Sequence, residues 1–304
     1  MVLRGRADVV TSQAWPELPL AAWQASKDTL QLYTQIVGKI RLALAPPEPQ
    51  WAHVTLYVTA RGLTTSPMPY RDKTIQMDFD FVAHKFIIDV SDGGSLSLDL
   101  RPRSVADFYA DVFALLEELG VVVHVNPIPQ KIPDPISFEK DTIHSAYDPE
   151  YVHRFWQVLA TVDTVFKRHR APFNGRHTPV HFFWGSFDLA YTRYCGRPAT
   201  PPPGSNRMMR LSMDAEELYA GFWPGDARLP EPAFGVYIYP KPDGLEAAKI
   251  APSAAAWNAD IGLFVLRYDD VRRSSSPADM VLEFLASTYT GCATMAAWDR
   301  SLSA

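Results

Sequence analysis

The positions of the 26 prolines limit where helices and strands can lie in this chain of 304 residues. Proline fixes its own φ angle and lacks an amide hydrogen, so it is tolerated in the first turn of a helix or between elements. Pro16, Pro149 and Pro277 each stand at the start of a long pattern of apolar residues at helical spacing. These three positions therefore predict helix starts, and the prolines at 127–135, 198–203 and 224–242 predict stiff loops.

The segments between the prolines carry a regular order of helix and strand patterns. Helices are predicted at about 15–45, 105–119, 149–170 and 276–297, and strands at 51–61, 74–82, 85–90, 96–100, 121–125, 180–192, 233–239 and 263–268. The order helix, strands, helix occurs twice, which predicts an α+β fold of two pseudo-repeated helix–antiparallel strands–helix halves sharing one core. We expect a leader at 1–14, a first half at 15–126, a proline-rich strap at 127–142 and a second half at 143–304. Coincidence among α+β segments is the alternative explanation of the repeat.

Charge and composition exclude several classes of partner. The formal net charge of −5 provides no basic face for nucleic acid, and no window approaches the ~18 apolar residues of a membrane span. The N-terminal residues lack the apolar core of a signal peptide, so a cytoplasmic location is expected. Two cysteines, Cys195 and Cys292, make no disulfide framework.

The predicted strand at 51–61 carries the most polar chemistry. Successive side chains of a strand point to opposite faces, so one face would collect His53, Thr55, Tyr57, Thr59 and Arg61 with Trp51. The other face is small and apolar. The pattern indicates either the lining of a pocket or a solvated sheet face, and both interpretations stay open.

The predicted strand at 180–192 places His181 and Arg193 on one face and Asp188 on the other. Gly185 lies in the middle of this pattern, and an isolated glycine in a strand often marks a bulge. One extra residue there would bring Asp188 onto the face of His181, where its carboxylate could orient the imidazole. A structural ion pair between Asp188 and an arginine is the alternative.

The remaining histidines and cations bear on whether the chain binds a metal or an anion. His144 and His153, with the two strand histidines, show no recognised metal-ligand spacing, so metal and cofactor stay undetermined. The guanidinium groups of Arg61, Arg193 and Arg197 suit carboxylate or phosphate recognition, whereas Lys39 and Arg41 are equally well explained as surface charge. The glycine-rich phosphate loops and the nucleophile elbow G-x-S-x-G are absent.

Several stretches of the chain resemble a bacterial family, domain-of-unknown-function family 5996. The resemblance is carried by WPELPLAAW, TQIVGKIRLAL, HVTLYVTARGLTTSPMPY, FDFVAH, YDPEYVHRFW, PVHFFWGSFDLAYTR, GFWPG, EPAFGVYIYP, FLASTY and AAWDR. It implies a bacterial cytoplasmic protein and supplies no activity. It marks a set of polar residues: Gln35, Lys39, His53, Tyr57, Arg61, His153, His181, Asp188 and Arg193. One departure is Ala52, where the family has a second tryptophan.

These observations favour an enzyme that acts on a small anionic molecule in a cleft between the two halves. His53 or His181 would be the general base, and Asp188 would orient it. The substrate-binding residues would be Gln35, Lys39, Tyr57, Arg61, His153 and Arg193. The alternatives are a non-catalytic small-ligand-binding module that uses the same residues and a histidine-ligated metal or haem protein. The oligomeric state is undetermined.

Overall fold

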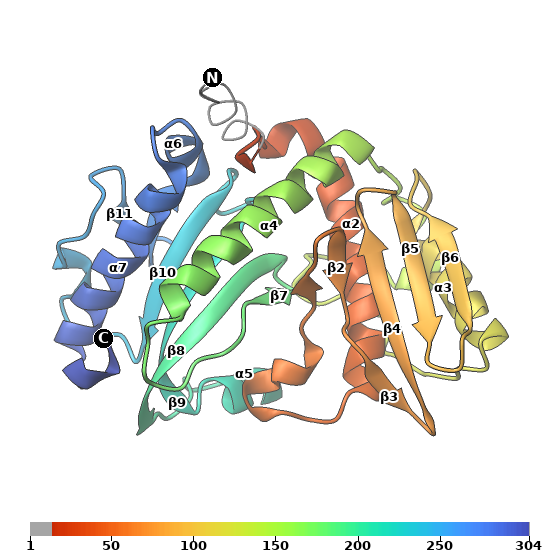
Figure 1. The fold of residues 1–304 in the computed structure, drawn as a ribbon, viewed down its shortest axis with the longest axis horizontal. Coiled ribbons are helices and arrows are strands. Elements are labelled where there is room, and N and C mark those ends of the chain that lie inside the picture. Colours follow the sequence, from red (N-terminus) through yellow and green to blue (C-terminus); the bar gives the residue numbers. More distant parts are fainter. Residues whose placement is uncertain (1–13, 304) are drawn as a thin grey trace, which may run out of the picture. The chain divides into compact units, whose positions relative to one another are not determined.

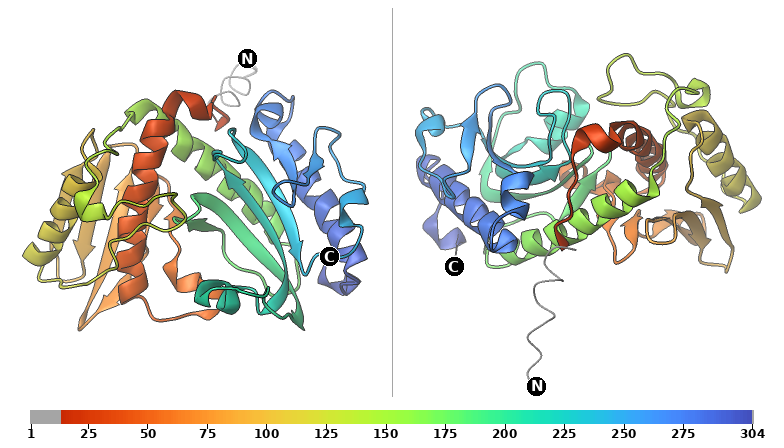
Figure 2. Two further views of the ribbon diagram at one scale, coloured as in Figure 1. Left: turned by 180° about the vertical axis from the view of Figure 1, so that it is seen from behind. Right: turned by 90° about the horizontal axis from the view of Figure 1, so that it is seen from above.

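A computed structural model describes residues 14–303, which form an α+β fold with two antiparallel sheets (Figures 1 and 2). The described residues divide into two compact units. The α2 unit comprises residues 21–156 and 181–187, and the α7 unit comprises residues 14–20, 157–180 and 188–303. The predicted α+β class is confirmed, whereas the repeat, the boundaries at 126 and 143 and the cytoplasmic location stay predictions. The predicted leader lies almost entirely outside the described residues.

The α2 unit is built on one antiparallel sheet with strand order β1-β2-β4-β5-β6, in which β3 also pairs with β4. Its helices are α2 (Leu20–Leu44), η1 (Pro49–Val54), α3 (Val105–Glu118), η2 (Phe138–Lys140) and the first part of α4 (Pro149–Arg170). Its strands are β1 (Tyr57–Val58), β2 (Gly62–Thr64), β3 (Met68–Tyr70), β4 (Lys73–Asp80), β5 (Lys85–Val90), β6 (Ser95–Asp99) and β7 (His181–Phe183).

The core of the α2 unit lies between its sheet and its two long helices. Tyr33 of α2 stacks on Phe108 of α3, with ring centroids 3.9 Å apart. Phe108 in turn contacts Phe79 of β4 and Phe86 of β5 at 6.4 and 5.5 Å. Both helices cover the same face of the sheet (Figure 2). Each helix has an apolar side, because its apolar residues recur at helical spacing, and this side packs on the sheet.

The α7 unit contains an antiparallel sheet with strand order β11-β12-β10-β9-β8. Its strands are β8 (Asp188–Pro198), β9 (Ala215–Trp223), β10 (Ala233–Tyr239), β11 (Ala256–Asn258) and β12 (Leu263–Arg267). Its helices are α5 (Arg207–Ser212), η3 (Leu245–Ala247), α6 (Tyr268–Arg272), α7 (Pro277–Met295), η4 (Arg300–Leu302) and the second part of α4. On one face of the sheet, Phe166 of α4 contacts Tyr191 and Phe234 at 5.3 and 6.3 Å, which forms an aromatic core.

Most predicted elements are confirmed with their ends close to the predicted residues. The start of α4 is the clearest case, because the Asp148 carboxylate accepts hydrogen bonds from the amides of Glu150 and Tyr151 (3.0 and 3.2 Å). The helix start predicted at Pro16 is wrong, because residues 16–19 are not helical and α2 begins at Leu20. Within residues 14–303, no helix is both long and apolar enough to cross a membrane.

The predicted strand at 51–61 is wrong over most of its length. Residues 49–54 form the kinked 3-10 helix η1, with positive φ angles at Gln50 and Trp51, and only Tyr57–Val58 pair as a strand. The imidazole Nδ1 of His53 accepts a hydrogen bond from the amide of Glu48 (3.1 Å), which closes this turn. The alternation of polar and apolar residues at 51–61 therefore does not reflect a pleated strand, because most of this stretch forms a turn.

The predicted strand at 180–192 is wrong as a single element, and so is the bulge at Gly185. The chain turns at 184–187, where Phe187 has a φ of +60° and its amide donates to the Phe183 carbonyl (2.7 Å). Trp184 holds the turn, because its ring lies over Gly38 of α2, where a Cβ would be 2.3 Å from the indole. Only glycine leaves room for this approach.

Two further segments differ between the prediction and the structure. The predicted strand at 121–125 is not a strand, because the amide of Val121 completes the end of α3 by donating to the Leu116 carbonyl (2.7 Å). Strand β9 was not predicted, although it provides the central partner of β8 and β10.

Candidate functional site

Arg41 and His181 of the α2 unit contact the Tyr57 ring, and His53 lies close enough to Arg41 to be affected by its charge; we call Arg41, His53, Tyr57 and His181 the Tyr57 cluster. The Tyr57 ring meets the His181 imidazole edge-on with centroids 5.5 Å apart. The Arg41 guanidinium lies over the same ring, 5.6 Å from its centroid. Arg41, His53 and His181 are buried, with 5%, 5% and 1% of their surface exposed, and Tyr57 is half-buried. The cluster thus combines a fixed cation, two imidazoles and a phenol in one place.

Backbone pairing sets the position of His181 beside Tyr57. Leu56 and Phe182 form an antiparallel bridge, with amide-to-carbonyl distances of 3.0 and 2.8 Å. The neighbours of this pair, Tyr57 and His181, therefore lie across from each other on one face. The indole of Trp184 donates to the Val54 carbonyl (2.7 Å), which fixes the turn after β7 to η1.

Arg41 lies in the last turn of α2 and is held by the following loop. Its Nη1 donates to the Thr65 carbonyl and to the Ser66 hydroxyl (3.1 Å for the latter). Its buried Nε has no hydrogen-bond partner, and no carboxylate oxygen lies within 4.0 Å of the guanidinium, among residues 14–303. Burial lowers the pKa of Arg41, against the smaller opposing effects of Tyr57 and Glu48. Arg41 is therefore a buried cation that forms no ion pair with a described carboxylate, and Glu48 compensates its charge only in part.

His53 is held as a neutral ring with a defined tautomer. Burial lowers its pKa, against opposing effects of the Glu48 backbone and charge, and the positive charge of Arg41 makes a smaller contribution to the lowering. Because Nδ1 accepts from the Glu48 amide, a neutral ring carries its proton on Nε2. The indole of Trp51 stacks on the imidazole, with centroids 5.3 Å apart, and limits its rotation. His53 is therefore suited to donate a hydrogen bond from Nε2.

The structure places Gln35 and Lys39 against the predicted strap. The Gln35 amide exchanges two hydrogen bonds with the backbone of Gln130 (2.9 and 2.8 Å). The Lys39 ammonium donates to the Ile128 carbonyl (2.8 Å) and lies over the Phe138 ring. Burial lowers the pKa of Lys39. In this structure both side chains fasten residues 128–130 to α2.

Arg61 and His153 take part in contacts at the turn between β4 and β5. Arg61 is largely exposed and forms an ion pair with Asp80 (2.6 Å), whose other oxygen accepts the amides of residues 82 and 83. His153 donates from Nδ1 to the Phe81 carbonyl (3.1 Å), and its ring contacts Trp156.

Asp188 belongs to the α7 unit, where it takes part in a chain of carboxyl and phenol groups. The Tyr219 hydroxyl donates to the Asp188 carboxylate (2.5 Å), and the Tyr219 ring stacks on that of Tyr237 at 4.8 Å. The Tyr237 hydroxyl donates to Glu217 (3.3 Å). Gly221 allows this arrangement, because a Cβ there would lie 2.1 Å from the Tyr219 hydroxyl. The role predicted for Asp188, orientation of His181, stays a prediction.

Glu217 is a buried titratable group that the sequence reasoning missed. It is 5% exposed, and burial raises its pKa to about 8, against the hydrogen bond from Tyr237. A carboxyl group with such a pKa can give or take a proton near neutral pH. The alternation of Glu217, Tyr219 and Gly221 with Leu218, Ala220 and Phe222 is the strand signal that could have found it.

Arg193 lies in β8, and its side chain is packed among aromatic rings. Its guanidinium is over the rings of Phe173 and Tyr289, at 4.8 and 4.7 Å from their centroids, and donates to the His169 carbonyl. Burial lowers the pKa of Arg193. Because the His169 carbonyl belongs to the last turn of α4, Arg193 supplies positive charge where the helix dipole favours it.

Histidine, cysteine and carboxylate side chains of residues 14–303 form no group of three or more that could hold a metal ion. His144 pairs with Asp141 (2.7 Å).

Comparison with known proteins gave one match. The model of a family of unknown function, DUF5996, matches residues 15–304. Neither the curated proteins nor the solved structures contain a significant match.

Proposed function

Since the chain belongs to the family of unknown function DUF5996, membership supplies no activity, and we propose from the site geometry that the protein is an enzyme acting on a small anionic molecule at the Tyr57 cluster. Arg41 would bind the anion, His181 would transfer the proton, and His53 and Tyr57 would donate hydrogen bonds to the substrate.

The buried guanidinium of Arg41 carries this proposal. A charge removed from water is costly unless an opposite charge or several hydrogen bonds compensate it. Arg41 has two hydrogen bonds to the 65–66 loop, but its Nε is unpartnered and no carboxylate pairs with it among the described residues. A carboxylate or phosphate group would supply the missing charge and accept from the guanidinium. An anion is therefore the ligand class that this cluster fits best.

The two imidazoles suit different tasks. His53 is neutral near pH 7 with its Nδ1 occupied, so it serves as a donor to a developing negative charge and not as a base. His181 shares the Tyr57 ring with Arg41, which brings it close to an anion bound there. Imidazole is the side chain whose ordinary pKa suits proton transfer at neutral pH.

The first test is binding. Inorganic phosphate, acetate and a library of phosphorylated and carboxylated metabolites are added to the full chain, and the melting temperature is measured. A ligand at a hundredfold excess over its Kd adds about 2.7 kcal/mol to stability, so we expect an increase of several degrees. Arg41→Gln should abolish the increase, whereas the exposed control Arg71→Gln should keep it. If no anion raises the melting temperature, or if Arg41→Gln still responds, the proposal is wrong.

The second test separates catalysis from binding alone. The ligand that stabilises the protein is incubated with it, and its conversion is followed by NMR spectroscopy. We expect turnover that falls by about 10²–10⁴-fold in His181→Gln, the size of a general acid–base contribution, while the increase in melting temperature is retained. A ligand that binds through Arg41 but is never converted would overturn the enzyme proposal in favour of a small-ligand-binding module.

A further inference from the structure

Trp51 lies in the same turn as His53 and presents a hydrogen-bond donor that the proposed function leaves unused. Its indole stacks on the His53 imidazole, with ring centroids 5.3 Å apart and 22° between the ring planes. The indole Nε1 is buried and has no hydrogen-bond partner among residues 14–303. Leaving a buried donor unpaired costs free energy, and a bound acceptor removes this cost. The unpaired indole is therefore a candidate contact for a ligand oxygen beside His53.

The backbone that carries Trp51 is strained. Gln50 and Trp51 have φ angles of +52° and +59°, in the left-handed region that residues with a side chain rarely adopt. Strain of this kind persists only where other contacts hold it, and it is concentrated at binding and catalytic sites. The turn is held by the Trp184 indole, which donates to the Val54 carbonyl at its end (2.7 Å). The position of the Trp51 ring is therefore fixed before any ligand binds.

Arg41 and His53 present two further donors in the same neighbourhood. The Arg41 side chain is 5% exposed, and its Nε is buried without a partner among the described residues. The His53 Nδ1 accepts from the Glu48 amide, so the imidazole N–H is on Nε2. His53 also lies close enough to Arg41 to be affected by its charge. Arg41, His53 and Trp51 thus offer three N–H groups to one ligand.

These three N–H groups do not lie in one plane. The Trp51 and His53 rings are stacked, so their N–H bonds lie in two different, nearly parallel planes. A carboxylate accepts hydrogen bonds best within the plane of its two oxygens. A phosphoryl or sulfonyl group has three terminal oxygens that point in different directions, and each is a strong acceptor. The donors therefore match a tetrahedral oxyanion better than a planar carboxylate.

We propose that the anion bound at the Tyr57 cluster carries a tetrahedral phosphoryl or sulfonyl group, and that Trp51 selects this group over a carboxylate. The selection rests on the function proposed above and adds the class of anion to it. Arg41 would supply the positive charge, and the Nε2 of His53 and the Nε1 of Trp51 would each donate to one oxygen. Removal of the Trp51 donor should therefore weaken the binding of tetrahedral anions and leave carboxylate binding unchanged.

The test compares anions that differ in shape. Acetate and methanesulfonate each carry one negative charge at pH 7, and methyl phosphate represents the phosphoryl group. Each is titrated into the full chain, and binding is followed in ¹H–¹⁵N NMR spectra. We expect methanesulfonate and methyl phosphate to bind about tenfold more tightly than acetate, the effect of one hydrogen bond to a charged group. The Trp51 indole N–H signal should move downfield with these two anions only, because this N–H gains an acceptor. A comparison of the two at about pH 5, where both carry one charge, distinguishes a phosphoryl from a sulfonyl ligand.

Two tryptophans provide matched controls. Trp51→Phe removes the donor and keeps an aromatic ring on the imidazole. It should weaken methanesulfonate binding about tenfold and leave acetate binding unchanged, and the loss of one indole signal identifies that of Trp51. The Trp23 indole lies in the same unit, its Nε1 is also buried and unpartnered among the described residues, and its ring packs on Phe155 at 5.2 Å. The Trp23 signal should therefore not move with any of the three anions.

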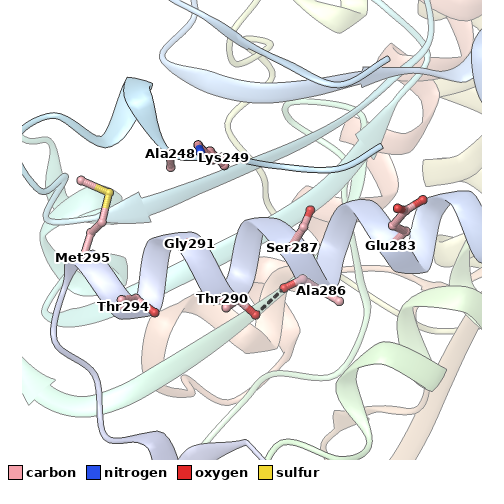
Figure 3. A pocket seen from close by; sticks show the side chains of 9 residues that line it. All are labelled: Ala248, Lys249, Glu283, Ala286, Ser287, Thr290, Gly291, Thr294 and Met295. Carbon is pink, nitrogen blue, oxygen red and sulfur yellow. Dashed lines mark hydrogen bonds between the residues drawn. The ribbon is translucent and has the colours of Figure 1, made fainter. Parts of the chain in front are cut away.

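The groove along α7 is another place where an anion could bind (Figure 3). It has a volume of about 620 Å³ in the α7 unit, and Lys249 is the cation among its lining residues. This ammonium group is exposed and stays hydrated, so an anion gains little free energy by pairing with it. Lys249→Gln should therefore leave the dissociation constants of all three anions unchanged.

The outcomes separate the class of anion from the site itself. Equal affinities for acetate and methanesulfonate, or an unmoved Trp51 signal while an anion binds through Arg41, would overturn the selection by Trp51 and leave the proposed function standing. If none of the three anions binds, or if Arg41→Gln binds them as tightly as the unmodified chain, both the proposed function and the role of Trp51 are wrong.

Discussion

At the scale of single residues, burial keeps the His53 imidazole of the Tyr57 cluster neutral, and the charge of Arg41 makes a smaller contribution in the same direction. Burial lowers the pKa of His53 most, Glu48 opposes this shift, and the guanidinium charge of Arg41 adds a smaller lowering. We predict that Arg41→Gln raises the pKa of His53, which an NMR titration of the imidazole nitrogens measures directly. The same spectra should show the proton on Nε2 at neutral pH. The exposed control Arg71→Gln should leave the titration unchanged, and an unchanged pKa in Arg41→Gln would remove the charge coupling.

Glu217 makes a prediction about stability and pH. Its pKa is about 8 in the folded chain against an ordinary value of 4.5, so the folded state keeps a proton that the unfolded state releases between these values. The free energy of unfolding must therefore fall as the pH rises from about 5 to about 8. Glu217→Gln, which stays neutral, should reduce this fall, as urea unfolding at several pH values would show. The exposed control Glu246→Gln should keep it. Identical pH profiles for Glu217→Gln and the unmodified chain would show that Glu217 ionises normally.

At the scale of elements, the contact of α2 with the turn after β7 determines where His181 lies. A Cβ at Gly38 would overlap the Trp184 indole at 2.3 Å, and this indole also binds the Val54 carbonyl. Gly38→Ala should therefore lower the free energy of unfolding by about 1–3 kcal/mol, the usual cost of overpacking. Gly185→Ala is the matched control in the same turn, because a Cβ there meets nothing within 4 Å. Equal stabilities of the two variants would show that the turn moves freely away from α2.

The elements also show how far sequence reasoning could reach. Helix α4 was predictable because Asp148 and Pro149 act on their own backbone. The 3-10 turn at residues 49–54 was not predictable, because it depends on a hydrogen bond from the Trp184 indole, which lies far away in the sequence.

The candidate site also contains both residues that the sequence predicts and residues that it does not. Tyr57 and His181 were predicted and do meet, whereas Arg41 resembles any helix surface cation until the fold buries it. The chain from Asp188 to Glu217 was missed because its links come from β9 and β10, and no local pattern joins these strands to β8.

At the scale of the whole molecule, neither compact unit is a continuous stretch of chain. Residues 14–20 belong to the α7 unit although most of that unit begins after residue 156, and residues 181–187 return to the α2 unit. No single cut through the chain therefore separates the two units intact. We expect excised halves such as 15–126 or 143–304 to lack a cooperative unfolding transition.

The N-terminal residues provide the sharpest test of this interleaving. The Trp15 ring is 6% exposed and packs on Tyr268 with centroids 6.0 Å apart, and the Tyr268 hydroxyl donates to the Pro16 carbonyl (2.8 Å). Arg272 pairs with Glu17 beside them (2.9 Å). Trp15→Ala should lower the free energy of unfolding by about 3–5 kcal/mol, the range for a buried tryptophan, measured by urea unfolding of the full chain. Trp257→Ala, at a half-buried position of the same unit, should cost less than half as much. If both variants lose the same small amount, the N-terminal segment does not help to hold the α7 unit together.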